Sequence, residues 1–352
     1  DTWFSSWLWP ISLFNGINNP DNEEINYYYP TCDLVTGPDI IFFWVARMIM
    51  AGYEYKKDMP FRNVYFTGIV RDKLGRKMSK SLGNSPDPLE LIDKYGADAV
   101  RMGMMLSAPA GNDILFDEAL CEQGRNFNNK IWNAFRLVKG WKVDQSGEQP
   151  QSAKIAVEWF NSMLAKVSAE IDQMLSKYRL SEALMAVYKL FWDDFCAWYL
   201  EVVKPAYGAG IDSVTYNATI GFFDTLLKIL HPFMPFITEE LWQNIEERKA
   251  GQTIMFEPIP EFENVDEVLL KNFEEATQVV MNVRNIRQTK GISPKEPLSL
   301  VIKGDFAQTM APVVERMANI SQIEFVQQME NRDAVASFLV GTIECFIPLS
   351  GM

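Results

Sequence analysis

The chain has 352 residues, of which 48% are hydrophobic and 22% charged, and its formal net charge is −13. This length allows two or three domains with large apolar cores, and the composition is that of a folded globular protein. The acidic balance argues against indiscriminate binding to nucleic acid, including DNA. The longer apolar runs, such as residues 40–53, are interrupted by Arg47 and too short to cross a bilayer, so we expect no membrane helix.

Positive charge is nevertheless concentrated in three segments. Residues 62–80 contain six Lys and Arg against Asp72 alone, and residues 125–142 contain five with no acid. A third group of four cations lies between residues 284 and 295. This segregation leaves room for a polyanion on one face of the molecule.

Cysteine and histidine usage points away from a metal centre. The four cysteines, at positions 32, 121, 196 and 345, have no zinc-ligand or disulfide spacing. We therefore expect their thiols to be buried and reduced, and the protein to be cytoplasmic. The single histidine, His231, is expected to be a core or helix-capping residue. We expect no tightly bound metal.

Residues 1–110 have an α/β pattern. Residues 26–37 are a strand candidate ending in Gly37, residues 39–53 a helix capped by Asp39 and ended by Gly52, and residues 63–70 a second buried strand. Two short helices, separated by a stop at Gly96, follow. The strand–helix–strand order predicts the distal half of a doubly wound, Rossmann-like parallel sheet.

Residues 111–290 have helical periodicity. An apolar stripe at helical spacing runs through residues 127–138, and long amphipathic helices are expected over residues 152–178, 180–205 and 217–245. These lengths predict an antiparallel α-helical bundle. A last helix over about residues 265–290 precedes a small α+β region at 291–352, with strands at 296–304 and 337–349 around a helix at 307–319.

The segment GRKMSKSLGN, residues 75–84, follows the second predicted strand. Ligands bind in doubly wound sheets at loops of this kind. Lys77 and Lys80 provide two mobile ammonium groups three residues apart, which suit a triphosphate whose charge moves onto departing pyrophosphate. Two lysines at this spacing are also typical of a solvated surface turn. The complete KMSKS pentapeptide favours the phosphate-binding interpretation.

The sequence resembles the class I aminoacyl-tRNA synthetases, of which KMSKS is the second signature. The segments DTWFSSWLWP, LVTGPDIIFFWVARMIMAGY, FTGIVRDKLGRKMSKSLGN, DPLELIDKYGADAVR and RNFNNKIWNAFR resemble the valyl branch, and HPFMPFITEELW is shared with the isoleucyl and leucyl branches. The resemblance implies activation of valine with ATP and Mg²⁺, and transfer of the valyl group to tRNA(Val). An isoleucyl- or leucyl-branch enzyme and a non-catalytic tRNA-binding descendant are the alternatives.

The resemblance also implies roles for individual residues. It places Lys77 and Lys80 at the ATP phosphates and Trp3 and Trp44 beside the valine side chain. It assigns to ATP binding Gly37, Asp39, Gly68, Ile69, Met78, Ser79 and Ser81. A helix cap is an alternative role for Asp39, and a place in the core is one for Trp44.

Two polar stripes are expected to contact tRNA. Asn129, Lys130, Asn133 and Arg136 lie opposite the apolar stripe of their predicted helix, and Arg284 and Arg287 form a second stripe with Lys290. An ordinary solvated face is the alternative for both stripes.

The family's first signature, His-x-Gly-His, is missing, because this chain has one histidine. We therefore expect the first half of the nucleotide fold, the editing domain and the C-terminal coiled coil to lie outside these residues. We also expect the isolated chain to be inactive in valine activation, while tRNA binding by it stays open.

Overall fold

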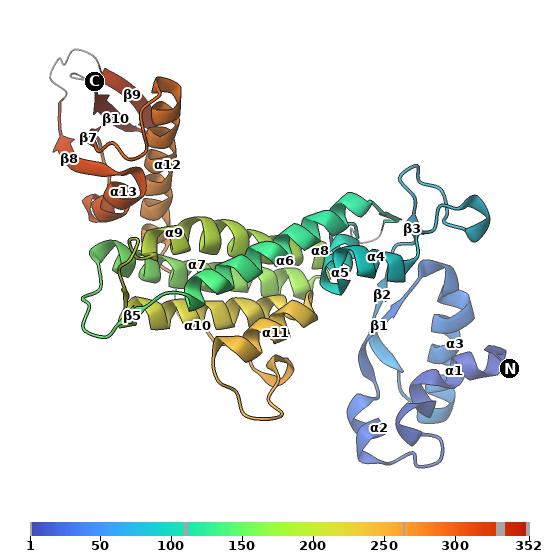
Figure 1. Cartoon of the computed structure of the whole chain (residues 1–352). Helices are drawn as coiled ribbons and strands as arrows, with labels where there is room; N and C mark the ends of the chain where they lie inside the picture. The colour runs from blue at the N-terminus through green and yellow to red at the C-terminus, as the bar shows by residue number, and fades with distance from the viewer. Residues whose placement is uncertain (1, 109–111, 263–264, 329–334, 350–352) are drawn as a thin grey trace. The chain divides into compact units, whose positions relative to one another are not determined.

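The computed structural model describes residues 2–108, 112–262, 265–328 and 335–349, with side chains from residue 4 onward (Figure 1). The chain divides into two compact units. The first comprises Asp1–Arg125 and Gln173–Met185, and the second comprises Asn126–Asp172 and Ala186–Met352.

The first unit is built around two parallel strand pairs. Its elements are α1 (Thr2–Ser12), α2 (Glu23–Tyr28), β1 (Thr31–Thr36), α3 (Ala46–Ala51), β2 (Phe61–Phe66), β3 (Val70–Arg71), α4 (Pro88–Tyr95), α5 (Ala97–Leu106), β4 (Ile114–Leu115) and the start of α6 (Glu118–Lys139). β1 pairs with β2, and β3 pairs with β4. Parallel pairing of β1 and β2 confirms that part of the predicted α/β pattern.

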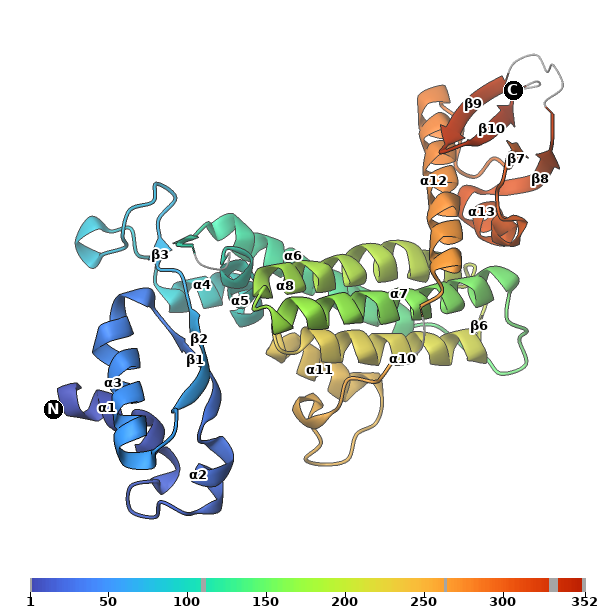
Figure 2. The ribbon, with the colours of Figure 1, turned by 180° about the vertical axis from the view of Figure 1, so that it is seen from behind.

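The β1–β2 pair packs its apolar side chains against α3. Leu34 and Phe61 of the strands form a buried cluster with Val45 and Met48, and Trp44 packs against this cluster. α1 lies beside α3 in both views (Figures 1 and 2). Burial of these side chains orients β1 and β2 so that their carboxyl ends leave the core together.

Three local expectations are corrected. The strand expected at 26–37 begins only at Thr31, because residues 26–28 belong to α2, which Asn22 caps by accepting a hydrogen bond from the Ile25 amide at 3.1 Å. Residues 63–70 are not one strand: β2 ends at Phe66 and β3 begins at Val70. The helix expected at 39–53 runs from Pro38 to Lys56 with 3₁₀ and π turns, and it passes through Gly52.

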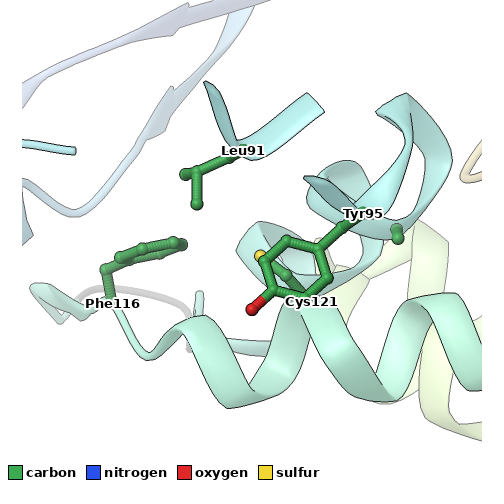
Figure 3. Packing of buried hydrophobic residues seen from close by; sticks show 5 residues of the cluster. Leu91, Tyr95, Phe116 and Cys121 are labelled. Carbon is green, nitrogen blue, oxygen red and sulfur yellow. The ribbon is translucent and has the colours of Figure 1, made fainter. Parts of the chain in front are cut away.

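A second apolar cluster supports β3 and the loop that follows it. Leu91, Tyr95, Ala99, Phe116 and Cys121 are buried together between α4, α5 and α6 (Figure 3). α4 and α5 are separate helices, as predicted, because Gly96 between them has φ 88°, which favours glycine. Val70 and Met78 pack against the same cluster.

The second unit is a helical bundle followed by a small sheet. Its elements are the rest of α6, β5 (Val143–Asp144), α7 (Gln151–Ser176), α8 (Leu180–Lys189), α9 (Leu200–Val203), β6 (Ile211–Asp212), α10 (Ser213–Leu230), α11 (Pro235–Ile245), α12 (Glu267–Lys290), β7 (Leu298–Lys303), α13 (Ala311–Ala318), β8 (Ile320–Val326), β9 (Val335–Val340) and β10 (Ile343–Pro348). α7 and α8 cross the boundary between the units.

Buried aromatic rings dominate the bundle core, in which the Phe160 ring packs at a tilt against Phe195 and Tyr199, with ring centres 5.3 and 5.2 Å away. The helix expected over 217–245 is corrected to two helices, because α10 ends at Leu230 and Pro235 begins α11. His231 is the C-cap residue of α10, which confirms the capping expectation, and its Nδ1 lies 2.7 Å from the Thr238 hydroxyl.

The C-terminal sheet has the order β8-β7-β10-β9. β7 pairs parallel with β8, and β10 pairs antiparallel with both β7 and β9. The expected strand at 296–304 and the helix at 307–319 are confirmed, whereas the segment expected as strand at 337–349 is a hairpin of β9 and β10, and β8 is an addition that the sequence analysis missed. Its pattern of exposed polar residues, with Ile320 the only buried side chain, gives a weak strand signal.

Among the described residues, no helix combines the length and the apolarity that a membrane span requires. All four cysteines are free thiols. Cys121, Cys196 and Cys345 are buried as expected, whereas Cys32 on β1 is exposed, so the expectation of burial is wrong for that residue.

Arg287 of α12 is a structural residue of the C-terminal region. Its side chain is only 4% exposed, and its guanidinium donates to the carbonyls of Ser293, Glu296, Ala318 and Asn319 at 2.7–3.0 Å. The exposed stripe expected over Arg284, Arg287 and Lys290 is therefore wrong at Arg287. The arginine ties α12 to the turn before β7 and to the end of α13.

Replacing Arg287 should loosen this region. We expect Arg287→Met to lower the local free energy of unfolding by about 2–4 kcal/mol, because four carbonyls in buried or part-buried bonds lose a charged donor. Hydrogen exchange of the β7 and β8 amides measures this loss. The matched control is Arg284→Ala, which removes an exposed side chain with one bond to the Met317 carbonyl and should cost less than about 1 kcal/mol. Equal protection in both variants would contradict the structural role of Arg287.

Candidate functional site

The candidate nucleotide-binding residues of β1 and β2 meet at one edge of the strand pair. The Thr67 amide donates to the Thr36 carbonyl at 2.9 Å, so the segments beginning at Gly37 and Gly68 leave the sheet side by side. A Cβ on Gly68 would lie 2.0 Å from the Asn112 carbonyl oxygen, so no larger residue fits this backbone. The structure thus brings Gly37 and Gly68 together.

Asp39 lies in the first helical turn after Gly37 and makes no capping hydrogen bond, because Gly37 is the N-cap residue. The helix-cap interpretation of Asp39 is therefore wrong. The Asp39 side chain is exposed, and it turns back so that a Cβ on Gly37 would lie 2.6 Å from its Oδ1. A glycine at position 37 keeps the backbone beside this carboxylate open.

Asp113 fixes the chain between β2 and the KMSKS loop. Its carboxylate accepts from the Ile69 amide at 3.2 Å and forms an ion pair with Arg71. The hydrogen bond from Arg71 is the main reason that the pKa of Asp113 lies below its usual value. Arg71 then pairs with Lys77 in an antiparallel bridge, so residues 72–76 form a tight turn. Ile69 and the lysine loop consequently share one anchored segment.

Asp72 is the centre of the turn. Its Oδ1 accepts from the amides of Leu74 and Arg76 at 3.0 and 2.8 Å. Its Oδ2 accepts from Arg76 Nε at 2.7 Å and from Asn84 Nδ2 at 3.0 Å. The Asn84 amide is the largest cause of a pKa lowered to about 2. Both carboxylate oxygens are therefore fully used within the loop.

Asn84 closes the loop from its far end. Besides Asp72, its amide side chain contacts the Lys77 carbonyl at 3.3 Å and accepts from the Ser79 amide at 2.9 Å. The hydroxyls of Ser79 and Ser81 lie 3.1 Å apart, and Ser79 Oγ caps the short turn at Lys80–Leu82. The serines thus shape the loop.

Lys77 and Lys80 keep their charges exposed to solvent. In the described ranges, neither ammonium group takes part in an ion pair or hydrogen bond, and both side chains are exposed. Their neighbours Arg71, Lys73 and Arg76 are each paired with an aspartate. Met78, between the two lysines, packs against the cluster of Figure 3. The loop therefore presents two unpaired cations on an anchored backbone.

An apolar cavity lies next to Gly37 and Asp39. It has a volume of about 550 Å³ and is lined by Trp9, Trp44, Thr36 and Ile40, among others. The rings of Trp9 and Trp44 are perpendicular, with centres 6.5 Å apart. Trp44 thus has one side in the apolar cluster and another on the cavity. Trp3 belongs to α1, but its side chain lies outside the described residues.

The candidate RNA-binding face of α6 is polar and exposed. The side chains of Asn129, Asn133 and Arg136 are exposed, and within the part of the chain that the structure describes they make no hydrogen bond or ion pair. Lys130 is half-buried, with its ammonium 5.3 Å from the centre of the Trp192 ring. The buried stripe beneath includes Phe127 and Ile131, as predicted.

The second predicted stripe does not form such a face. Arg284 is exposed but bonds the Met317 carbonyl at 2.9 Å and lies 5.9 Å from the Trp198 ring. Arg287 is buried, as described above. Among these described residues, the α6 face therefore offers several unpaired donors, whereas Lys290 is the one exposed and unpaired cation of the second stripe.

Two family models match the chain. Residues 1–117 match the class I tRNA synthetases (I, L, M and V), and residues 157–302 match the anticodon-binding domain of tRNA ligase. The whole chain is 68% identical to a valine–tRNA ligase of Phocaeicola vulgatus and 65% identical to one of Parabacteroides distasonis. It belongs to the class I aminoacyl-tRNA synthetases. The chain spans 40% of the length of these relatives.

The fold is similar to that of solved synthetases. The LeuRS–tRNA–LeuAMS ternary complex of Agrobacterium radiobacter superposes on 86% of this chain and 34% of that one, with a TM-score of 0.53 and 19% identity. A more distant relative, the valine–tRNA ligase of Fusobacterium nucleatum, is 41% identical over the whole chain and 41% of its own length. The likeness to LeuRS supports the synthetase fold.

Sequence reasoning missed three residues of this candidate site. Asp72 and Asn84 hold the KMSKS loop, and Trp9 borders the cavity with Trp44. The order Asp-x-x-Gly at 72–75 is a recognisable turn signal, because an aspartate side chain readily accepts from the amide two residues on. No local signal distinguishes Trp9 from the other tryptophans of α1.

Removing the Asp72 carboxylate should release the loop. We expect Asp72→Ala to abolish the amide protection of Leu74, Arg76 and Ser79, because the turn loses its acceptor and its link to Asn84. Amide hydrogen exchange checks this, with Asp87→Ala, which caps α4, as the control for a general effect of losing an aspartate. Unchanged protection in Asp72→Ala would contradict the clamp.

The same clamp predicts a pH dependence. Because the pKa of Asp72 is about 2 in the fold against 3.8 unperturbed, its stabilisation of the loop is complete well above pH 4 and lost as the pH falls through 2. The amide shifts of Leu74 and Arg76, followed by NMR between pH 6 and pH 2, should titrate near the lower value. A midpoint near 4 would mean that the carboxylate is unpaired.

Proposed function

We propose that this chain is part of a valine–tRNA ligase, which joins valine to ATP as valyl-adenylate and transfers the valyl group to tRNA(Val). The observation that carries the proposal is the exposed, unpaired Lys77 and Lys80 on a loop that Asp113 and Arg71 anchor to Ile69, the residue after Gly68. High identity to valine–tRNA ligases over the whole chain supports valine over isoleucine or leucine. We propose the division into residues 1–110 as the distal half of a Rossmann-like catalytic sheet, 111–290 as the anticodon-binding bundle and 291–352 as a small α+β subdomain.

The proposed role of the lysines is electrostatic. In adenylate formation the valine carboxylate attacks the α-phosphorus of ATP, presented as its Mg²⁺ complex, and pyrophosphate leaves. Negative charge accumulates on the leaving group, and Lys77 and Lys80 stabilise it. Because Asp72 is occupied by Arg76 and Asn84, no carboxylate in the loop competes for these ammonium groups. Mobile lysine chains can follow the departing phosphate.

The proposed ATP-binding residues divide into backbone and side-chain roles. Gly37 and Gly68 allow the adenosine to approach the ends of β1 and β2, and Asp39 is placed to accept from the ribose hydroxyls. Ile69 and Met78 provide backbone for the adenine, while Ser79 and Ser81 hold the loop in shape. Anchoring of Met78 in the apolar cluster supports this division.

The proposed valine pocket is the cavity bordered by Trp44, with Trp3 as a second wall. Rigid indole walls exclude the longer isoleucine by overpacking, whereas threonine, nearly the same shape as valine, is poorly rejected by an apolar pocket. Valyl synthetases therefore require an editing step, which belongs to the complete protein. Position of the cavity beside Gly37 and Asp39 supports the assignment.

The proposed tRNA contacts are Asn129, Lys130, Asn133 and Arg136 of α6. Exposed amides and an unpaired guanidinium can donate to phosphates and to the edges of unstacked bases. The match of residues 157–302 to an anticodon-binding domain supports RNA as the partner of the bundle. Arg284, which lies at the surface of α12, is a further candidate contact.

Replacing Lys80 tests the catalytic proposal. In the complete protein we expect Lys80→Ala to slow valine-dependent ATP–pyrophosphate exchange by about 10²–10³-fold, because one donor to the leaving charge is lost. The melting temperature should not change, since the side chain has no partner in the described fold. Lys73→Ala, which removes the exposed partner of Asp117, is the control and should exchange at the wild-type rate. Wild-type exchange by Lys80→Ala would overturn the phosphate role.

Replacing Arg136 tests the RNA face. We expect Arg136→Ala to weaken tRNA(Val) binding and to reduce the slope of log affinity against log salt by about one, as for a lost phosphate contact. Binding titrations at several salt concentrations measure both quantities. Lys154→Ala, an exposed lysine of α7 with no assigned role, is the control. Identical slopes for Arg136→Ala and wild type would show that this face is merely solvated.

A further inference from the structure

Tyr178 occupies an unusual position in the turn between α7 and α8. Its φ is 56°, in the left-handed region. The Arg179 amide donates to the Met174 carbonyl at 2.9 Å, and the Tyr178 amide donates to the Leu175 carbonyl at 3.0 Å. This is the Schellman arrangement that ends helices, and glycine is the usual residue at the left-handed position. A tyrosine held there needs compensation from its side chain.

The Tyr178 side chain reaches both strands of the β1–β2 pair. Its hydroxyl donates to Asp33 on β1, and its ring stacks on Tyr65 of β2 with centres 5.6 Å apart. Asp33 also accepts from Asn63, its register partner on β2, at 3.2 Å. Tyr178 thus contacts β1 through its hydroxyl and β2 through its ring, and so braces the two strands. Residue 178 belongs to the same compact unit as both strands.

This brace lies close to the strand ends that carry the candidate adenylate site. Val35, the register partner of Tyr65, is two residues from Gly37, and Tyr65 is three residues from Gly68. Residue 178 nevertheless falls in the segment that matches the anticodon-binding model, whereas β1 and β2 fall in the segment that matches the catalytic one. A residue of the RNA-binding segment therefore contacts the strands of the catalytic segment.

We propose that Tyr178 is a positioning residue for adenylate formation, which sets the ends of β1 and β2 through Asp33 and Tyr65. The inference rests on the proposed function and adds to it a residue outside the nucleotide fold. In-line attack on a phosphate is sensitive to small displacements of the groups that orient the reactants. A shift of β1 against β2 would move Gly37 and Asp39 relative to Gly68, and Tyr178 opposes that shift.

The test uses the complete protein and a reaction that contains no RNA. Tyr178→Phe removes only the hydroxyl, and Tyr178→Ala removes the ring as well. We expect valine-dependent ATP–pyrophosphate exchange to fall roughly 3–10-fold in the first variant and up to about 100-fold in the second, within the range for misplaced reactants. Rates are expressed per active site from a burst titration, so partial unfolding does not enter. The KM for tRNA should stay within about twofold of wild type.

Two further variants separate positioning from general stability. Asp33→Asn keeps an acceptor for the hydroxyl and should retain most of the exchange activity, whereas Asp33→Ala should lose as much as Tyr178→Phe. Combining Tyr178→Phe with Asp33→Ala should add little to the effect of Asp33→Ala alone, because both variants remove the contact between the Tyr178 hydroxyl and Asp33. The control is Tyr216→Phe on α10, a half-buried tyrosine whose hydroxyl bonds no other described residue, and it should exchange normally.

Each outcome has a distinct meaning. Wild-type exchange per active site in both Tyr178 variants would overturn the positioning role while leaving the proposed function intact. A raised KM for tRNA with normal exchange would overturn it in favour of RNA contact. Absence of valine-dependent exchange in the unmodified protein would overturn the proposed function itself, and this inference with it.

Discussion

The candidate site depends on how one carboxylate distributes its hydrogen bonds. Asp72 is the only acid among the six cations of residues 62–80, and a free aspartate there would pair with whichever lysine reached it. Its four acceptor positions are instead taken by the Leu74 and Arg76 amides, the Arg76 side chain and Asn84. All the acceptor positions of the carboxylate are thus used in folding the turn. Lys77 and Lys80 therefore stay unpaired, as their proposed role at the phosphates requires.

The same principle explains why the loop needs its other anchors. Two exposed ammonium groups three residues apart repel each other, and a loop without fixed points would separate them. Met78 provides one fixed point by packing against the cluster around Tyr95 and Phe116, and Asn84 provides another by bonding both ends of the loop. A rigid backbone with mobile side chains suits the proposed role, in which the ammonium groups follow the charge that moves onto the leaving phosphate.

The sequence predicted the elements whose signals are local. Helical periodicity located the bundle, Gly96 separated α4 from α5, and KMSKS identified the loop. The prediction failed where contacts between residues far apart in the sequence determine the structure. Arg287 has the spacing of an exposed stripe, but four carbonyls from the following turn and α13 draw it into the interior. The break between α10 and α11 was visible as two prolines, yet the apolar pattern continued across it. β8 has too few buried residues to be recognised before its partner β7 is known.

The net charge of −13 is compatible with the proposed tRNA partner, because the overall negative charge and the local cations act at different ranges. The acidic surface repels polyanions at long range, which weakens binding to nucleic acid at large. Productive contact must then come from a surface where cations and amides are unpaired at short range, within the screening length of about 8–10 Å at moderate salt. The α6 face satisfies that condition, because Asn129, Asn133 and Arg136 are exposed and unpaired. Arginines that are already bonded to the protein, such as Arg287, contribute to the charge count without contributing to recognition. For the proposed RNA binding, the pairing state of each cation is therefore more informative than the overall composition.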